Sequence, residues 1–306
     1  MENVYRNFYL NFYRRTNGFI PVAPLGQTVY PGDFFQIRNG QVIVLGNIFR
    51  KQVIEAHDVE IGYHHQLNPA GWNFSDGLSK PYSGRGSGRG PIAGEFEFSK
   101  QILAFAERGS FIFKASGPES VRILNWNDIQ QALIIRLTQT FYSFREVYVV
   151  TETATAADWT LAIAGASQAE LEIATDAENF GLVDLFGEQS SRTIQSRDIE
   201  FYQREELRKS SFFKAKKLVM REEKLENLVS DLMLEWREHN EWARRFYAYD
   251  FHYDQHYRAD MGAISELNTM DLLPPNELNP NTALLYFKWA DASLDDVEKL
   301  FSADGE

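Results

Sequence analysis

Two histidines in the last quarter of the chain have the spacing of metal ligands. His252 and His256 are four residues apart, so on a helix both imidazoles would lie on one face, as a metal site requires. A metal site between helices normally repeats a Glu-x-x-His motif on a second helix, and no such repeat occurs. His57, His64 and His65 form a second, looser group. A metal-dependent hydrolase centred on His252 and His256 is therefore one alternative hypothesis. Carboxylates near these two histidines in the sequence are Glu235, Glu238, Glu241, Asp250 and Asp254.

A glycine-rich stretch at residues 83–91, Ser-Gly-Arg-Gly-Ser-Gly-Arg-Gly-Pro, could present backbone N–H groups to a phosphate. It lacks the Gly-Lys-Ser/Thr ending of a nucleotide-binding loop. We interpret it as a flexible loop in which Arg85 and Arg89 could contact anionic surfaces. No nucleophile elbow or other hydrolase spacing occurs, so we expect no enzymatic activity and no cofactor.

The composition predicts a globular protein without disulfides. The chain has 306 residues, 44% of them apolar, and no cysteine. No apolar run is long enough for a membrane-spanning helix, and residues 1–15 have no signal-peptide pattern. We therefore expect a cytoplasmic protein, and its net charge of −12 argues against nucleic acid as a partner.

The negative charge is concentrated at one end of the chain. Residues 226–306 contain 17 acidic and 6 basic side chains, whereas residues 1–225 contain 26 and 25. A nearly neutral body followed by an acidic tail suggests that the tail covers part of the body. We expect two domains, a body at 1–221 and a helical, acidic C-terminal segment at 222–306.

Local patterns predict an α+β body with a twisted antiparallel sheet and packing helices. Asn39-Gly40 between two apolar runs is a hairpin signal for strands at 34–38 and 41–49. Residues 145–153, 158–164 and 169–174 are predicted to be consecutive antiparallel strands, the second pairing with the first. Further expected elements are helices at 3–16 and 126–139, strands at 95–98, 110–114, 198–205 and 212–220, and a helical or extended stretch at 101–106.

The remaining segments are predicted to be loops or tail helices. We expect a mobile excursion at 57–92 and a polar loop at 176–198. Residues 222–257 have a helical period, 259–281 are typical of an exposed linker, and 283–289 are predicted to be helical. Ser293 is expected to begin a last helix that has acidic residues in its first turn.

The order of these segments resembles the pore-forming domain of bacterial gasdermins over about residues 3–220. The pieces most similar to the family are Val147-Tyr-Val-Val-Thr151 and Phe212-Phe-Lys-Ala-Lys-Lys-Leu-Val219. The resemblance implies a protein that its C-terminal segment keeps inactive. By the same resemblance, a protease would remove that segment, and the body would then oligomerise in the inner membrane and kill the cell in anti-phage defence.

The resemblance also implies which regions act. Two regions, approximately residues 57–115 and 146–219, would become membrane-inserting β-hairpins. Many bacterial members carry an N-terminal cysteine for acylation; this chain has none, so helix 3–15 alone would anchor it. The implied partners are an activating protease, anionic lipids and further copies of the chain. Candidate lipid-facing residues are Phe8, Phe12, Arg85, Arg89, Lys214, Lys216 and Lys217. Candidates for the cleavage region are Arg221, Arg258, Asp260, Met270 and Asp271.

A second alternative involves neither a membrane nor chemistry. An acidic amphipathic tail can also be an ordinary helical subdomain, and the chain would then be a soluble interaction or assembly protein whose tail binds a partner helix.

Overall fold

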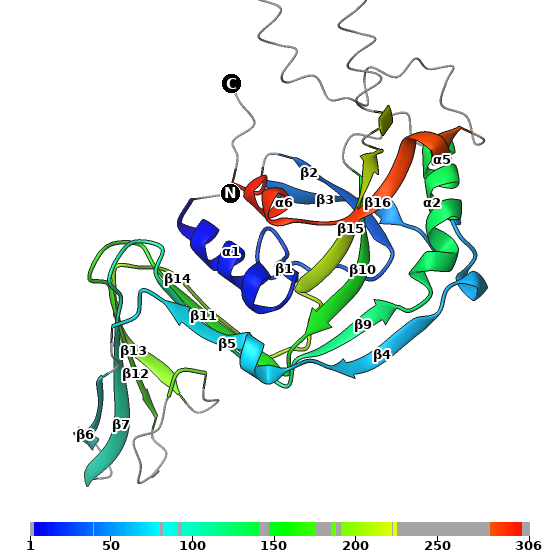
Figure 1. The fold of residues 1–306 in the computed structure, drawn as a ribbon. Helices are drawn as coiled ribbons and strands as arrows, with labels where there is room; N and C mark the ends of the chain where they lie inside the picture. The colour runs from blue at the N-terminus through cyan, green and yellow to red at the C-terminus, as the bar shows by residue number, and fades with distance from the viewer. Residues whose placement is uncertain are drawn as a thin grey trace, which may run out of the picture.

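A computed structural model gives the fold of the chain (Figure 1). It describes residues 3–38, 40–79, 82–90, 94–140, 147–175, 185–187, 191–221, 223–224 and 282–301. The helices are η1 (Asn3–Tyr5), α1 (Arg6–Arg15), η2 (Ala56–Asp58), η3 (Pro69–Trp72), α2 (Trp126–Thr140), α5 (Ala283–Tyr286) and α6 (Leu294–Glu298). The strands up to residue 123 are β1 (Ile20–Pro21), β2 (Asp33–Arg38), β3 (Gln41–Asn47), β4 (Ile61–Gln66), β5 (Asn73–Asp76), β6 (Tyr82–Gly90), β7 (Gly94–Ala104), β8 (Phe111–Ser116) and β9 (Glu119–Ile123). The later strands are β10 (Tyr148–Thr155), β11 (Asp158–Ala164), β12 (Glu170–Thr175), β13 (Arg192–Arg197), β14 (Ile199–Glu205), β15 (Phe212–Met220) and β16 (Phe287–Asp291).

The dominant feature is a bent ribbon of four long strands, which we call the ribbon. Its strands are β4–β5–β6, β7–β8–β9, β10–β11–β12 and β13–β14–β15, each divided by bends into three pieces that lie in three successive sheets. The pieces keep one antiparallel order in every sheet: β4 pairs with β9, β9 with β10 and β10 with β15, and the other two sheets repeat this order. The ribbon is thus two nested hairpins, 61–123 and 148–220, joined side by side.

Hydrogen bonds continue across both bends of the ribbon. At the first bend Leu67 N donates to Pro118 O at 3.0 Å and Ala157 N donates to Ser116 O at 2.8 Å. At the second bend Phe105 N donates to Ala169 O at 2.9 Å. Gly77 lies at this second bend with φ +64°, and a Cβ there would come within 2.2 Å of the Ser110 Oγ. The bends therefore fold the ribbon without breaking it into separate hairpins.

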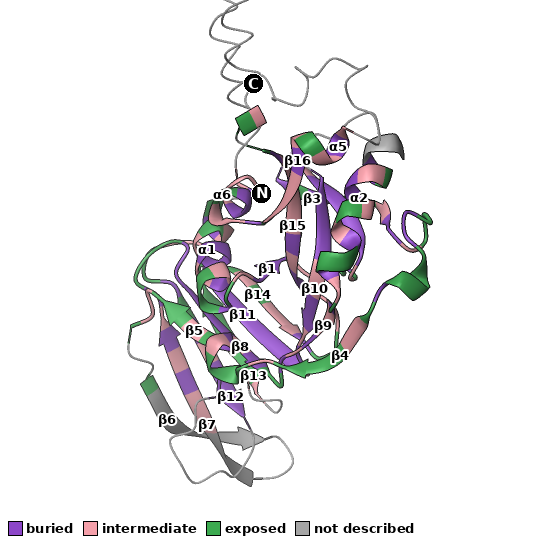
Figure 2. Ribbon diagram, turned by 45° about the vertical axis from the view of Figure 1, so that its right-hand side comes forward, coloured by how far each residue is buried: buried purple, intermediate pink, exposed green. Residues whose placement is uncertain are grey.

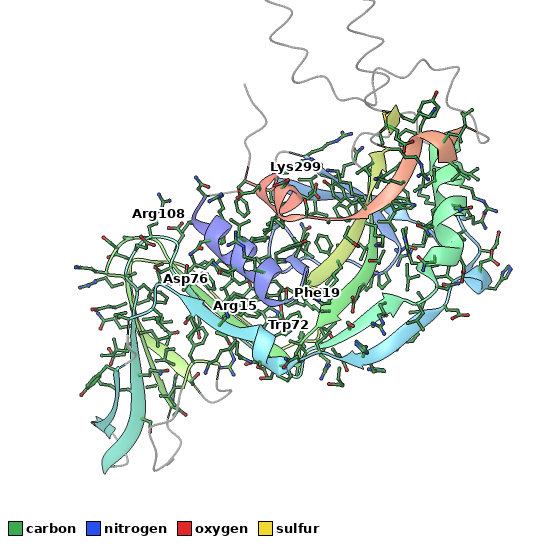
Figure 3. All side chains as sticks on the ribbon, viewed as in Figure 1. Arg15, Phe19, Trp72, Asp76, Arg108 and Lys299 are labelled. Carbon is green, nitrogen blue, oxygen red and sulfur yellow. The ribbon has the colours of Figure 1, made fainter. Side chains whose placement is uncertain are left out.

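Helix α1 lies inside the curve of the ribbon, and aromatic side chains fill the space between them (Figures 1 and 3). Phe8, Tyr9 and Phe12 on α1 are all 0% exposed. The Phe12 ring stacks on Phe212 of β15 at 4.8 Å and meets Trp72 edge-on at 5.2 Å. This packing explains the helical spacing of the N-terminal aromatics, since their common face forms the main core.

A second core lies under α2. Ile129, Leu133 and Leu137 are buried on one face of this helix and pack with Val147 and Val149 around the start of β10. The predicted helices at 3–16 and 126–139 and the predicted strands at 34–38, 41–49, 198–205 and 212–220 are confirmed. The expected α+β class with an antiparallel sheet is also confirmed.

Two predicted loops were wrong in part. Residues 57–92 were expected to be a mobile excursion, but β4, β5 and β6 lie within them, and β6 pairs with β7 along its whole length. Residues 192–197 of the expected loop at 176–198 form β13. Glycine, serine and arginine give β6 little strand propensity, so its pairing depends on β7. The uncertain stretch at 101–106 is extended, with 101–104 in β7.

The predicted pairing of consecutive strands was also wrong. β10, β11 and β12 follow one another along a single long strand of the ribbon, and each pairs in a different sheet. In the tail, residues 287–289 were expected to be helical but belong to β16, because α5 ends at Tyr286. The helix expected within 222–257 and the linker expected at 259–281 lie outside the described residues, apart from 223 and 224.

Candidate functional site

The last described residues, 282–301, are built into the body, and we call them the cover segment. Its strand β16 pairs antiparallel with β15, from Phe287 opposite Met220 to Asp291 opposite Lys216. Figure 1 shows β16 running beside β15, with α5 next to α2 and α6 next to α1. The cover segment therefore closes the part of the β15 edge that β1, paired at residues 212 and 213, leaves open.

Apolar side chains of the cover segment complete two of the cores. Ala283 and Phe287 pack with Leu218 and Ile134, and both are 0% exposed. Val297 and Leu300 of α6 reach the aromatic core around α1, where the Tyr9 ring meets Phe301 edge-on at 5.3 Å (purple in Figure 2 where buried). Removing the segment would therefore expose apolar surface at both cores.

Asp296 is the polar centre of the contact. Its carboxylate is 3% exposed and accepts hydrogen bonds from Tyr148 Oη at 2.6 Å and Lys217 Nζ at 2.9 Å. It also caps α6 in a reciprocal pair with Ser293. Burial by itself would raise the pKa of Asp296, but the bonds from Lys217 and Tyr148 outweigh it, and the pKa lies below its ordinary value. The acid is therefore held as a charged anchor.

Further polar contacts surround this anchor. Asp291 Oδ1 lies 2.6 Å from Lys216 Nζ, and Glu298 forms an ion pair with Arg6 of α1. The Trp289 indole N–H donates to the carbonyl of Gln130 in α2 at 2.9 Å. Contacts thus tie the segment to α1, α2 and β15 together.

The three lysines that were predicted to face lipid lie on β15, and each of them interacts with an acidic side chain in this structure. Lys216 and Lys217 pair with Asp291 and Asp296 of the cover segment. Lys214 lies 3.4 Å from Glu152 and 4.5 Å from the centre of the Phe19 ring. In this conformation the cover segment neutralises two of the basic side chains at the β15 edge.

The other predicted lipid-facing residues lie elsewhere. Phe8 and Phe12 are fully buried, so neither faces solvent while α1 occupies the core. Arg85 and Arg89 lie on β6, opposite Ser99 and Glu95 of β7.

Of the candidate cleavage residues, only Arg221 lies in the described part of the chain. Its backbone N–H donates to Tyr286 O at 2.7 Å and its side chain to Leu284 O at 3.2 Å. Arg258, Asp260, Met270 and Asp271 lie outside the described residues. Residues 225–281, which we call the connector, therefore join two points of the body that lie next to each other.

The sheet farthest from the cover segment has an alternating sequence on two of its strands. Glu95-Phe96-Glu97-Phe98 in β7 and Glu170-Leu171-Glu172-Ile173 in β12 place acidic and apolar residues in turn. In β12 the alternation matches the burial, because Leu171 and Ile173 are buried whereas Glu170 is exposed.

The described residues contain no group of three or more histidine, aspartate or glutamate side chains arranged to hold a metal ion. His57 lies near Asp58 and His64 near Glu119, each at 3.3 Å and on the surface. His252 and His256 lie outside the described residues. None of the described helices is long and apolar enough to cross a bilayer.

Sequence reasoning did not identify Phe287, Trp289 and Asp296 as contact residues. Asp296 was recognised only as a favourable charge in the first turn of a helix. The acidic excess of the tail and the lysines of β15 were the available signal, because opposite charges on two segments can predict a contact.

Comparisons with known proteins find similar solved structures, and two gasdermins are among them. No family model and no curated protein matches the sequence. The cryo-EM structure of the gasdermin A3 membrane pore matches with 10% identity and a TM-score of 0.29, over 71% of this chain and 90% of that one. A bacterial gasdermin from Bradyrhizobium tropiciagri matches with 11% identity and a TM-score of 0.30, over 69% of this chain and 88% of that one.

Proposed function

We propose that this chain is a pore-forming protein without enzymatic activity, which the cover segment keeps inactive. A protease cuts the connector, the cover segment leaves, and the body oligomerises in the inner membrane. The observation that carries the proposal is the cover segment itself: an acidic C-terminal strand and helix seated on the basic edge of a two-hairpin ribbon.

The ribbon supports the membrane step. Its hairpins, 61–123 and 148–220, coincide closely with the regions of about 57–115 and 146–219 that the family resemblance assigns to insertion. A strand that spans a bilayer needs about 9–11 residues with alternating faces. β7 has 11 residues and β12 has 6, and the two alternate acidic with apolar side chains in the same sheet.

The charge distribution supports release before membrane binding. Residues 226–306 carry a net charge of −11, so removing them leaves a body with a net charge of −1. A basic residue near an anionic leaflet gains about 1 kcal/mol. Losing Asp291 and Asp296 frees Lys216 and Lys217 for such a leaflet. The proposed biological setting is cell death in anti-phage defence, with the uncut protein in the cytoplasm.

Dye release from anionic liposomes tests the proposal. Full-length protein is compared with protein cut at an engineered site in 259–281 and, separately, near residue 222. We expect leakage only after cutting. If both cut forms stay folded and silent, a soluble interaction protein is the better account.

A matched pair of variants tests the role of the alternating strand. Phe98→Asp replaces an apolar residue of the alternating run in β7 with a charge, and we expect it to reduce leakage by at least tenfold. Glu97→Gln changes an acidic residue of the same run and should leave leakage within about twofold of the unmodified cut protein. Equal leakage from both variants would remove the first hairpin from the mechanism.

A further inference from the structure

A cavity lies at the seam between the cover segment and the body. β1 pairs with β15 at residues 212 and 213, and β16 pairs with it from residue 216 onward, so the two strands lie end to end along one edge (Figure 1). The cavity is at the gap between them and has a volume of about 390 Å³. On the body side it is lined by the end of α1, the turn after it, and Lys214 and Ala215 of β15. Asp291 and Ala292 line it from the cover segment.

Two basic side chains line the body side of the cavity. Arg14 is exposed, and no described acidic side chain pairs with it. Lys214 Nζ lies 3.4 Å from Glu152, which is longer than a normal charged hydrogen bond. Both cations can therefore contact a further anion. A guanidinium recognises a carboxylate with two parallel hydrogen bonds.

Negative groups lie at the same cavity. Asp291 Oδ1 accepts a hydrogen bond from Lys216 Nζ at 2.6 Å, and its Oδ2 makes none with a described residue. The Asp291 side chain is 83% exposed, so this second oxygen can accept from a cation. α1 ends at Arg15, which places the negative end of the helix dipole here as well. These groups repel a phosphate more strongly than a singly charged carboxylate, and they attract an ammonium.

The size of the cavity limits the ligand further. An apolar cavity of about 150 Å³ in another protein holds benzene, so about 390 Å³ has room for about 15 non-hydrogen atoms. A dipeptide such as alanyl-leucine is of this size, whereas a single small amino acid would fill less than half of the space. Ala215 and Ala292 are buried, and with the Tyr13 ring they offer apolar surface to the side chains of such a ligand.

We infer that this cavity binds a zwitterion of about dipeptide size, with its carboxylate on Arg14 and Lys214 and its ammonium on Asp291. The ligand contacts the body and the cover segment at once, so it binds well only while the segment is seated. By linkage, binding makes the departure of the segment less favourable. Binding to the intact protein is independent of the proposed function, and only its effect on activation rests on that function.

L-Alanyl-L-leucine is the probe, and two blocked forms of it are the matched controls. N-acetylation removes the ammonium, and C-terminal amidation removes the carboxylate. Titration calorimetry of intact protein should give a dissociation constant of about 1 mM or lower for the dipeptide. Each blocked form should bind at least tenfold more weakly. Equal binding of all three would overturn the zwitterion assignment, and no saturable binding of the dipeptide would overturn the site.

Matched variants locate the binding. Arg14→Gln should weaken dipeptide binding at least tenfold, whereas Arg15→Gln, at the next exposed arginine, should change it less than twofold. Asp291→Asn should also weaken it at least tenfold, and Asp295→Asn, at an exposed acid outside the cavity, should not. All four side chains are exposed, so the variants should fold, which thermal unfolding checks. Equal effects within either pair would overturn the assigned contacts.

Hydrogen exchange of residues 216–220 tests the linkage to the cover segment. At ten times its dissociation constant, the dipeptide should slow exchange of these residues about tenfold in intact protein. The acetylated form at the same concentration should not. Binding without slower exchange would confine the site to the body and overturn the linkage.

Dye release separates this inference from the proposed function. If the cut protein leaks dye, the dipeptide should slow leakage severalfold and the acetylated form should not. Binding and slowed exchange without any leakage support the cavity and overturn the pore. Leakage without dipeptide binding overturns the cavity and leaves the pore-forming proposal standing.

Discussion

The two edges of the ribbon differ in whether other described strands pair with them. The β15 edge is closed by β1 and by the cover segment, with a buried acid and an ion pair fixing its lysines. The β4 edge has exposed side chains at residues 63–66 and no described strand beyond it. Proteins must protect sheet edges from unwanted pairing. Among the described residues only the β15 edge is protected, by β1 and by the cover segment.

Among single substitutions, Phe287→Ala should most strongly weaken the closure of the β15 edge. Phe287 is fully buried between β15 and α2, so the variant should destabilise the cover segment by about 3–5 kcal/mol. Leu285→Ala, at a side chain 57% exposed, is the control and should cost less than about 1 kcal/mol. Hydrogen exchange of residues 216–220 in intact protein reports the difference. Equal protection in both variants would mean that the segment does not close this edge.

Asp296→Asn should have the next largest effect. The variant leaves Lys217 without its charged partner, and we expect a loss of about 2 kcal/mol in the same exchange measurement. Asp295→Asn is the neighbouring control, because Asp295 is exposed and we expect less than about 0.5 kcal/mol there. A larger loss from Asp295→Asn would contradict the role given to Asp296.

Acid should loosen the same contact. The pKa of Asp296 is lower in the folded protein than its ordinary value, so its contribution to stability is complete above that value, near 3.9. It is lost as the pH falls through the folded pKa. Protection of residues 216–220 should therefore fall below about pH 4, and the fall should be smaller in Asp296→Asn. An identical acid profile in the variant would assign the transition to other carboxyl groups.

The smallest expected effect is at the surface pair of Arg6 and Glu298. Both side chains are partly exposed, 48% and 35%, so Glu298→Gln should cost less than about 1 kcal/mol. Salt should shrink the difference between variant and unmodified protein. A cost above 2 kcal/mol in thermal unfolding would show that α6 depends on this pair more than on its buried face.

Short sequence patterns were enough to predict the helices and the hairpin whose backbone is determined by neighbouring residues. Asn39-Gly40 predicted the β2–β3 hairpin, and Ser293 with Asp296 forms a reciprocal cap at the start of α6. Aromatic spacing predicted α1, whereas its Phe8 and Phe12 were predicted to face lipid and are buried in the core. In these cases a few neighbouring residues determine the backbone, so no distant partner is needed.

Elements that depend on distant partners were missed. β6 is rich in glycine and is a strand because β7 pairs with it. The short sequence of β16 is compatible with a helix or a strand, and it forms a strand because it pairs with β15. The sequence predicted that an acidic tail covers the body and that Lys216 and Lys217 matter, but their partners Asp291 and Asp296 depend on a register that only the fold supplies.

The bond from Arg221 N to Tyr286 O places both ends of the connector side by side, which makes the connector a tether. Covalent linkage keeps the cover segment at a high effective concentration beside β15, and a cut within 225–281 would abolish that advantage without breaking any contact described for residues 282–301. Cleavage therefore turns a folded element into a bound peptide. Its departure becomes a separate equilibrium, which dilution should shift toward dissociation and which added peptide of the same sequence should reverse.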